Sequence, residues 1–545
     1  MTRYKFNNIL KTKKVTFFIL FLFSILILFY FLYSFNFKFS SYGLNLFLNY
    51  ITNLFKFQSD DSTSFKENLW IINLRLLWIT LKVVFSGSVL GLFLAFITSY
   101  FSVLNIRKKN YISFTIRVLI IFLRSFPILI AITLFSNIFK GQLIATIIFF
   151  YSTWLWMHRY FCDIIEASDT KSFWIHINLE QKRFKSFWLH IVINNKNKFI
   201  MHSLMSIESN LRWNSILGSI GIVGIGFLFK YYETKFEFLS ISILYIVIFI
   251  MLFELILFLL NKYLFVGILI NKVNINTNKS LKYNYKKIIY LFLFLILLIL
   301  LFWNLIDIYD YQTNWKLLWL WLKGFLNPNF SDILNKPSIY MIYLDVFKLT
   351  YTSLYIGSIF AFFISLFMSE KLFSIYIFLP FRFFITLLKT IPVIVYYILF
   401  STFSDVNFAL LSSLIIIIFR TLSKQFAEVI NKTDISIIKH WITLGYSRFF
   451  IYKNILIMKN IKEIISLIAF EFEGTFRNVI TYGIFANINL YLLVKSYEKF
   501  AEYGKIVPIF LPAIILYFLT EIVYLFIKIN LKKKILYLFL TKIKH

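Results

Sequence analysis

The sequence predicts an all-α integral membrane protein with about 12 transmembrane helices, arranged as two parallel six-helix repeats. Composition is the first reason: 60% of the 545 residues are hydrophobic and 21% are aromatic, more than a water-soluble domain buries. The second reason is that Lys and Arg concentrate in the gaps between long apolar blocks. The third is a set of charged residues, prolines and glycines that recurs 265 positions later.

The repeat consists of residue types that are uncommon in an apolar chain. Pro127, Asp169, Arg183, Glu208, Arg212 and Gly218 have counterparts of the same type in Pro392, Asp434, Arg448, Glu473, Arg477 and Gly483. Chance would seldom keep so many polar positions in one register, so the pattern indicates two related halves fused head to tail. Six spans per half is an even number, which gives both halves the same orientation.

The basic gaps set the topology, because loops rich in Lys and Arg stay on the cytoplasmic side. In the first half we expect spans near 15–35, 77–101, 113–138, 142–157, 199–229 and 238–266. The first of these is a retained signal anchor, since no small-residue cleavage site follows it. The polar stretch 37–75 lies outside the cell, and 158–198 forms an inside loop.

The second half repeats this order near 288–308, 345–368, 374–401, 405–421, 462–494 and 506–529, with an inside loop at 422–460. Both termini are then cytoplasmic, and the protein crosses the plasma membrane many times. We divide the chain into an anchor with an external segment (1–74), a first membrane domain (75–268), a basic linker with a further span and external segment (269–344), a second membrane domain (345–530) and a basic tail (531–545).

The formal net charge of +32 bears on whether the chain binds nucleic acid or anionic lipid. Basic chains can bind nucleic acid, but here the positive charge lies in short loops between spans, which favours contact with the anionic lipid of the bilayer. We therefore expect no nucleic acid partner. A single Cys162 allows neither an internal disulfide nor a cysteine metal cluster, and the six His show no ligand spacing, so no metal site is expected.

The inside loop of the second half carries Glu428 and, 17 residues later, Gly445. This resembles the coupling loop, or EAA motif, of ABC importer permeases. In the first half Asp163 stands at the acidic position and Glu180 replaces the glycine. The resemblance implies helices that dock into a cytoplasmic ATPase dimer, with coupling residues Asp163, Asp169, Arg183, Glu428, Asp434, Gly445 and Arg448. An ordinary solvated basic loop is the alternative.

Residues 208–226 resemble the signature of phosphonate-type permeases: an acidic residue, Asn-x-Arg, Leu-Gly and a glycine run of Gly218, Gly221, Gly224 and Gly226. The second half keeps Glu473, Arg477 and Gly483 but loses the later glycines. The resemblance covers roughly 75–266 and 345–530, which makes these segments the two permease domains. The glycines allow close helix packing.

Glu208 and Arg212, like Glu473 and Arg477, are four residues apart and share a helix face. Each pair either lines a path that meets an anionic solute or is a structural ion pair at a bent helix. Pro127 and Pro392 follow a basic-x-x pattern that resembles the family's third span. They are expected to kink the helix, either as a hinge or as a plain structural bend.

The expected function is that of a permease subunit of an ABC importer, and not that of an enzyme. The resemblance implies a cytoplasmic ABC ATPase dimer and an extracellular solute-binding protein as partners, with phosphonate, phosphate or a phosphorylated organic compound as solute. The chain has no Walker-type sequence, so no cofactor is expected in it and ATP belongs to the partner. The alternative function is an ion-coupled secondary transporter. A membrane acyltransferase, suggested by the His158 and Asp163 spacing, and a structural scaffold are weaker candidates.

Overall fold

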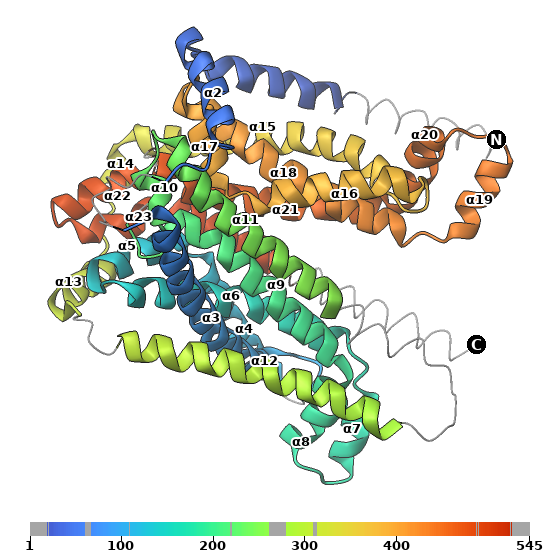
Figure 1. The fold of residues 1–545 in the computed structure, drawn as a ribbon. Helices are drawn as coiled ribbons and strands as arrows, with labels where there is room; N and C mark the ends of the chain where they lie inside the picture. Colours follow the sequence, from blue (N-terminus) through green and yellow to red (C-terminus); the bar gives the residue numbers. More distant parts are fainter. Residues whose placement is uncertain are drawn as a thin grey trace, which may run out of the picture. The chain divides into compact units, whose positions relative to one another are not determined.

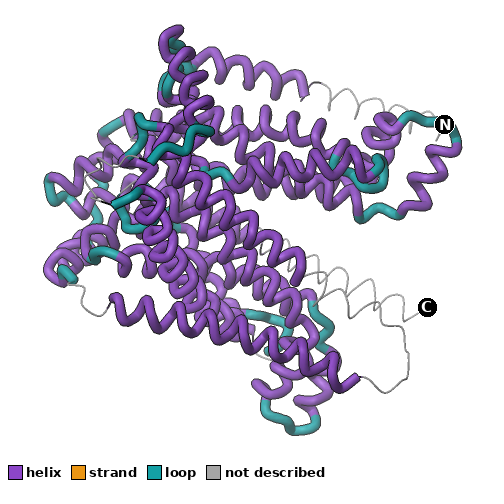
Figure 2. The backbone as a smooth tube through the Cα atoms, in the orientation of Figure 1, coloured by secondary structure: helices purple, strands orange, loops and turns teal. Residues whose placement is uncertain are grey.

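The computed structural model describes residues 19, 21–59, 67–107, 110–218, 221–260, 279–308, 313–486, 488, 490–523 and 525. These residues are almost entirely helical (Figure 2), and the described part of the chain contains one isolated β-bridge, between Phe39 and Ser404, but no strand. An all-helical fold follows from the apolar sequence, because a helix satisfies its backbone hydrogen bonds internally. The ends of the chain, and with them the basic tail and the orientation predicted for both termini, lie outside the described residues.

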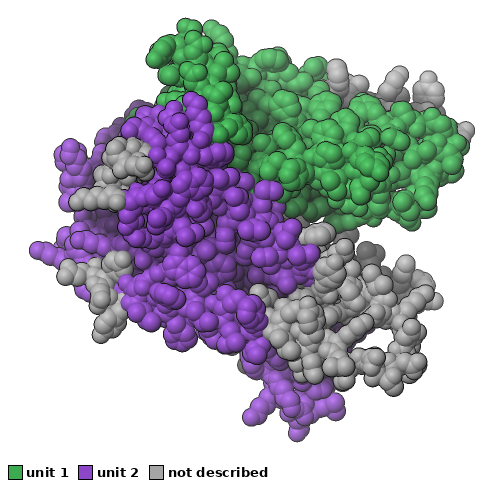
Figure 3. Space-filling view, in the orientation of Figure 1, with its two compact units in different colours: residues 1–55, 338–489 green, residues 56–337, 490–545 purple. Residues whose placement is uncertain are grey.

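The chain forms two compact units (Figure 3) that do not coincide with the two halves of the sequence. Unit 1 contains residues 1–55 and 338–489, and unit 2 contains residues 56–337 and 490–545. The N-terminal segment therefore belongs to the unit built mainly from the second half. Each unit is described by itself below.

Unit 2 is built around α3 (Leu69–Ser102) and α6 (Gln142–Ala167), which pack against each other. Its other helices are α4 (Asn110–Ser125), α5 (Ile128–Ile138), α7 (Lys171–Asn178), α8 (Arg183–Phe187), η1 (Trp188–Val192), α9 (Ile193–Gly218), α10 (Phe227–Tyr231), α11 (Phe236–Leu259), α12 (Lys279–Ile308), α13 (Trp315–Leu326), α14 (Ser331–Asn335), α22 (Leu490–Lys499), η5 (Tyr503–Lys505) and α23 (Ile506–Ile509). Because α9, α11 and α12 all pack on α3, this helix is the centre of the unit.

Unit 1 has a smaller set of helices: α2 (Ser41–Asn53), α15 (Pro337–Phe367), α16 (Ile375–Thr390), α17 (Val393–Ser401), α18 (Val406–Asn431), α19 (Ile435–Thr443), α20 (Arg448–Ile451), η4 (Tyr452–Ile457) and α21 (Met458–Ala486). The helices α15, α16, α18 and α21 run side by side (Figure 1), and α16, α17 and α21 all pack on α18. At one end of this bundle α19 and α20 form the loop between α18 and α21.

Four described helices are long and apolar enough to cross a membrane: α3, the 236–257 part of α11, α15 and α18. Three bent helix pairs raise this number to seven if each is one span. These seven match seven of the 12 predicted spans. Helices also occupy the other five positions, but α6, α9 and α21 are less apolar, and the apolar parts of the first and seventh are short. The structure thus supports a multi-pass membrane protein, while the full count of 12 stays a prediction.

The first segments of each sequence half pack on helices of the other half. Within unit 1 the Tyr351 hydroxyl of α15 donates to the carbonyl of Ser24, and the N–H of Ser40 donates to the carbonyl of Phe403 at 2.8 Å. Within unit 2 the N–H of Asn314, which begins α13, donates to the carbonyl of Ile138 at 2.9 Å. Phe403 and Ile138 are 265 residues apart, so the two contacts are equivalent. The anchor span and external helix of each half therefore pack on the body of the other half.

Candidate functional site

The inside loop of unit 1 consists of two short helices joined by a tight turn. Asp434 caps α19, because its carboxylate accepts the N–H of Ser436 at 3.3 Å. The chain then reverses at Gly445, whose φ of +81° lies in the left-handed region that favours glycine. Hydrogen bonds from the N–H groups of Gly445 and Tyr446 to the carbonyls of Ile442 and Trp441 close the turn.

The inside loop of unit 2 adopts the same turn with different residues. Asp169 accepts the N–H of Lys171 at 3.0 Å, the equivalent of the Asp434 contact. Glu180, at the position of Gly445, has a φ of +61°. The N–H groups of Glu180 and Gln181 donate to the carbonyls of Ile177 and His176. The absence of glycine therefore does not change the turn, although Glu180 holds a strained backbone conformation there.

Both loops expose large apolar side chains at equivalent positions. Leu444 and Leu179, beside the turn, are 56% and 65% exposed, and Phe449 and Phe184, on the following helices, are 53% and 57% exposed. Such an apolar face is typical of a helix that docks into a groove of another protein. The geometry can therefore offer two similar docking elements, one in each unit.

The remaining predicted loop residues lie on the helices around the turn. Exposed Glu428 is on α18 and half-buried Asp163 is on α6, each on the helix that leads into its loop. Arg183 and Arg448 begin α8 and α20 and are exposed, and the Arg448 guanidinium lies 5.1 Å from the ring centre of Phe373. The structure does not gather these acidic and basic residues into one cluster, so their individual roles stay predictions.

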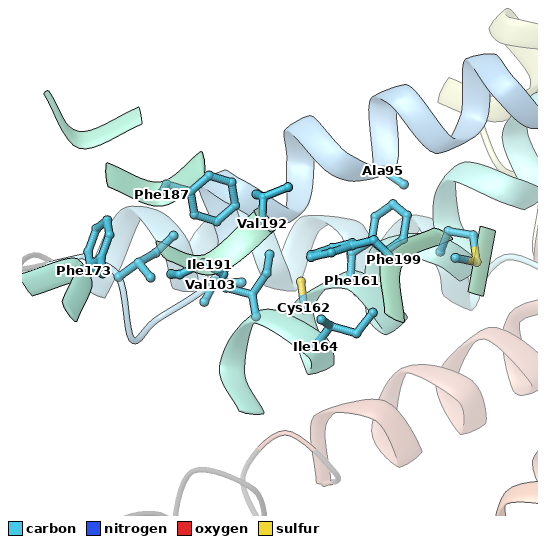
Figure 4. Close-up of a cluster of buried hydrophobic side chains, with 13 residues drawn as sticks. Ala95, Val103, Phe161, Cys162, Ile164, Phe173, Phe187, Ile191, Val192 and Phe199 are labelled. Carbon is cyan, nitrogen blue, oxygen red and sulfur yellow. The ribbon is translucent and has the colours of Figure 1, made fainter. Parts of the chain in front are cut away.

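A buried apolar cluster connects the unit 2 loop with α3 and α6 (Figure 4). Phe173 from α7 and Phe187 and Ile191 from α8 and η1 are fully buried in it, together with Ala95 and Val103 from the region of α3. Short helices are marginal alone, and this packing holds α7 and η1 in a fixed relation.

The predicted charge pairs form on their helices. Glu208 and Arg212 pair on α9, and Glu473 and Arg477 pair on α21, with an Arg477 Nη2 to Glu473 Oε1 distance of 2.9 Å. Asn210, between the first two, donates to the hydroxyls of Ser88 and Thr153, both at 2.8 Å. These contacts tie α9 to α3 and α6. Both the structural and the path-lining interpretation stay open.

The glycine run of the first half permits a sharp reversal after α9. A Cβ added to Gly218 would overlap the backbone of Gly226, and a Cβ on Gly224 would lie 2.6 Å from the Asn214 amide. Gly221 and Gly224 both have positive φ. In the second half α21 continues past buried Gly483 to Ala486, in keeping with the loss of the later glycines there.

The two prolines lie at breaks between helices. The axes of α4 and α5 differ by 74° at Pro127, and those of α16 and α17 differ by 81° at Pro392. Proline leaves carbonyls of the preceding turn without helical donors. Side chains supply them: the Tyr151 hydroxyl donates to the Leu123 carbonyl at 3.1 Å, and Arg420 donates to the equivalent Leu388 carbonyl at 2.6 Å and to that of Ile391 at 2.9 Å.

Sequence reasoning missed several buried ion pairs in unit 2. Glu521 pairs with both Arg124, just before the Pro127 break, and Arg159 of α6, and the latter N–O distance is 3.1 Å. Arg117 pairs with Glu166, and Lys82 pairs with Asp307 of α12. A charged residue inside an apolar span costs free energy and is usually functional or paired. The presence of charge in these spans could therefore have indicated the residues of the ion pairs.

Among the described residues no group of three or more His, Cys, Asp or Glu is placed to hold a metal ion. His158 contacts the hydroxyl of Thr98 at 3.0 Å, and the buried Cys162 lies 3.1 Å from that of Ser102. This small polar cluster between α3 and α6 gives no support to the acyltransferase interpretation.

Comparison with known proteins gives two relatives. Over 511 residues the chain is 27% identical to "ABC transport system permease protein p69" of Mycoplasma genitalium, with 90% of each chain covered. The protein of the same description from Mycoplasma pneumoniae is 25% identical over 518 residues, which are 90% of this chain and 91% of that one. These relatives support an ABC transporter permease. No family model and no solved structure matches the sequence. Together with the apolar helices, the permease relatives point to a multi-pass transport protein of the plasma membrane.

Proposed function

We propose that the chain is the membrane-spanning subunit of an ABC importer and supplies both membrane halves of the transporter. The observation that carries the proposal is the pair of loops with the same left-handed turn, at Glu180 and Gly445, and the same exposed apolar side chains. A cytoplasmic ATPase dimer has two equivalent surfaces, which two equivalent loops fit. The permease relatives support the same class of function over nine tenths of the chain.

The loops have the geometry needed to transmit motion. Each begins at the end of a long helix, α6 or α18, and returns through a π-helical turn, η1 or η4, into α9 or α21. When ATP closes the partner subunits, displacement of α7 and α19 would move these long helices. The breaks at Pro127 and Pro392 lie in helices that pack on α6 and α18, where a change of angle can be absorbed.

We further propose a small anionic solute, of the phosphonate or phosphate type or a phosphorylated organic compound, delivered by an extracellular binding protein. The resemblance of residues 208–226 supports this assignment. Arg124 and Arg159 both pair with Glu521 and place two guanidinium groups inside unit 2. An anion that crosses near them would meet these charged groups.

The coupling role is tested by placing a charge on the exposed apolar faces. Leu444→Asp and its matched variant Leu179→Asp change side chains that are more than half exposed, so the chain should still insert. We expect each variant to reduce solute-stimulated ATP hydrolysis and uptake at least tenfold, with a larger loss in the double variant. Leu334→Asp, at an exposed site far from both loops in the sequence, is the control.

Unchanged ATP-driven uptake in the double variant would refute docking through these loops. Uptake abolished by an ionophore but independent of ATP would instead favour the secondary transporter.

A further inference from the structure

Helix α13 of unit 2 carries an exposed stripe of large apolar side chains. The stripe consists of residues spaced three or four positions apart, which therefore share one face of the helix: Trp315, Trp319, Leu322 and Leu326. They are between 40% and 72% exposed. A helix that meets only water normally has polar side chains on its outer face, so this stripe calls for an occupant.

The opposite face of α13 is fixed within unit 2. Trp321 is buried and packs on the ring of Tyr503, with ring centroids 5.9 Å apart. A Cβ added to Gly324 would lie 2.8 Å from the backbone nitrogen of Gly504, so the two backbones are in close contact. Rotation of α13 to bury the stripe would break this packing. The stripe is therefore a lasting part of the outer surface of unit 2.

Helix α13 begins close to the ends of two predicted membrane spans. The apolar part of α12 ends at Ile308, six residues before Asn314, which caps α13. The N–H of Asn314 donates to the carbonyl of Ile138, the last residue of α5 in the bent pair at Pro127. Near its end α12 exposes Trp303 and Ile306, as a helix that faces lipid would. The stripe thus starts near the level at which the chain leaves the bilayer.

Lysines border the stripe along one side. Lys316 and Lys323 are exposed and follow Trp315 and Leu322 by one position, which places both about 100° around the helix axis from the stripe. Helix α13 contains no acidic residue. Helices that lie in the plane of a membrane surface combine an apolar face rich in Trp and Leu with Lys on the neighbouring polar face. This combination favours lipid as the occupant of the stripe.

The matching helix of unit 1 does not have the stripe. Because the N–H groups of Ser40 and Asn314 make equivalent hydrogen bonds, α2 and α13 can be aligned from these caps. The residues of α2 at the four positions of the stripe are then Ser41, Asn45, Leu48 and Thr52. The fold accepts a mostly polar face at this place, so folding alone does not explain the tryptophans of α13.

We propose that α13 is an interfacial helix whose stripe lies in the outer leaflet of the bilayer, between the lipid headgroups and the acyl chains. Trp315 and Trp319 then occupy the level at which tryptophan is enriched in membrane proteins. Lys316 and Lys323 reach the lipid phosphates. The helix sets the level of unit 2 in the membrane at the outer end of α12, and unit 1 has no such anchor in α2.

The test asks whether lipid or water covers the stripe in the full-length chain, reconstituted into vesicles of phosphatidylcholine and phosphatidylglycerol. Leu322→Cys carries a fluorescent label within the stripe, and Leu48→Cys carries the same label at the matching position of α2. The natural Cys162 is buried, so the label reacts with the introduced cysteine. Phosphatidylcholine with a nitroxide near the headgroup end of its acyl chain quenches a label in lipid, and iodide on both sides of the membrane quenches a label in water.

We expect the lipid nitroxide to quench the label at position 322 roughly threefold more than the label at position 48, and iodide to show the opposite order. Trp315→Ser together with Trp319→Asn gives α13 the side chains of α2 at two positions of the stripe and retains the buried Trp321. In this variant the label at position 322 should become accessible to iodide.

Equal quenching of the two labels by iodide would overturn the proposal, because the stripe would then lie in water and be open to a protein partner. Protection of the label at position 322 from both quenchers would also overturn it, since protein would then cover the stripe. The measurement needs neither an ATPase nor a solute, so its failure leaves the proposed function intact.

Discussion

At the scale of single residues, the turn positions Glu180 and Gly445 show most clearly how sequence and backbone conformation are related in the two loops. Both adopt positive φ, yet only one is glycine, the residue that adopts this conformation without strain. A side chain in the left-handed region costs about 1 kcal/mol or slightly more. The first loop therefore retains the turn in spite of its sequence, through its hydrogen bonds and the buried cluster to which its helices contribute Phe173 and Phe187.

Glu180→Gly should therefore stabilise the first turn, and Gly445→Ala should destabilise the second, each by about 1 kcal/mol. Space is not the issue at Gly445, since a Cβ there would meet nothing within 4 Å. Hydrogen exchange of residues 176–182 should slow about fivefold in Glu180→Gly, and exchange of 441–447 should accelerate by a similar factor in Gly445→Ala. Unchanged exchange in both variants would mean that the turns are not held in the left-handed conformation.

Asp169 and Asp434 were predicted as coupling residues, and each accepts a backbone N–H at the start of its short helix, although only Asp434 is at the N-cap position. The backbone N–H of Ser436, and then its side chain, hold the pKa of Asp434 below its ordinary value of 3.8. A carboxyl whose pKa is depressed by folding stabilises the fold above its unfolded pKa and loses this effect as pH falls through the folded pKa. Helix α19 should therefore keep its cap above about pH 4 and fray below it.

Asp434→Asn retains an oxygen acceptor and should preserve the cap at neutral pH, and it should remove the pH dependence. Asp434→Ala should fray α19 at every pH. The exchange rates of Ser436 and its neighbours between pH 3 and pH 7 distinguish the two variants, after correction for the intrinsic effect of pH. If all three chains behave alike, the Asp434 carboxylate does not cap the helix.

At the scale of elements, the broken helices show how the sequence handles proline in an apolar environment. Pro127 and Pro392 predicted the breaks, but the donors that satisfy the freed carbonyls could not be predicted. Tyr151 lies on α6 and Arg420 on α18. The position equivalent to Tyr151 in the second half is 416, one helical turn before Arg420, so the 265-residue register does not relate the two donors. Only the three-dimensional packing of α4 on α6 and of α16 on α18 brings them to equivalent carbonyls.

Removing these donors should destabilise the breaks to different extents. Tyr151→Phe loses one hydrogen bond and should cost about 1 kcal/mol. Arg420→Met loses two bonds from a charged donor and should cost more, about 2–3 kcal/mol, although the Tyr396 hydroxyl still donates to the Leu388 carbonyl at 2.9 Å. Thermal inactivation of the purified chain in detergent measures both effects. Equal midpoints for the wild type and Arg420→Met would show that the guanidinium does not pin the break.

At the scale of the whole molecule, the sequence predicted membrane spans, a repeat and two inside loops, and the structure contains a helix at each of the predicted positions that it describes. The repeat predicted which positions of the two halves are equivalent, but it did not predict which segments pack against each other. Nothing in the register indicates that Ser40 bonds to Phe403 or that Asn314 bonds to Ile138, because apolar spans of similar composition can pack on either half. For the same reason the buried pairs Lys82–Asp307 and Arg159–Glu521 were not foreseen.

The crosswise packing of the first spans has a direct test. With Ser40→Cys and Phe403→Cys, oxidation should form a disulfide that keeps both halves joined after protease cleavage at a site inserted near residue 270. Asn314→Cys with Ile138→Cys should do the same, and each single cysteine provides the control. Separation of the halves after oxidation and cleavage would show that each anchor packs within its own half.

We propose that the chain, as an ABC permease subunit, is coupled to an ATPase through both loops. The most direct measurement is purification from native membranes in mild detergent, followed by assay of co-purified Mg-ATP hydrolysis. We compare the wild-type chain with the Leu179→Asp and Leu444→Asp double variant. We expect an ATP-hydrolysing subunit that is bound to the wild-type chain and lost from the variant, which should still be inserted in the membrane. An ATPase retained equally by both chains, or bound by neither while uptake proceeds, would contradict it.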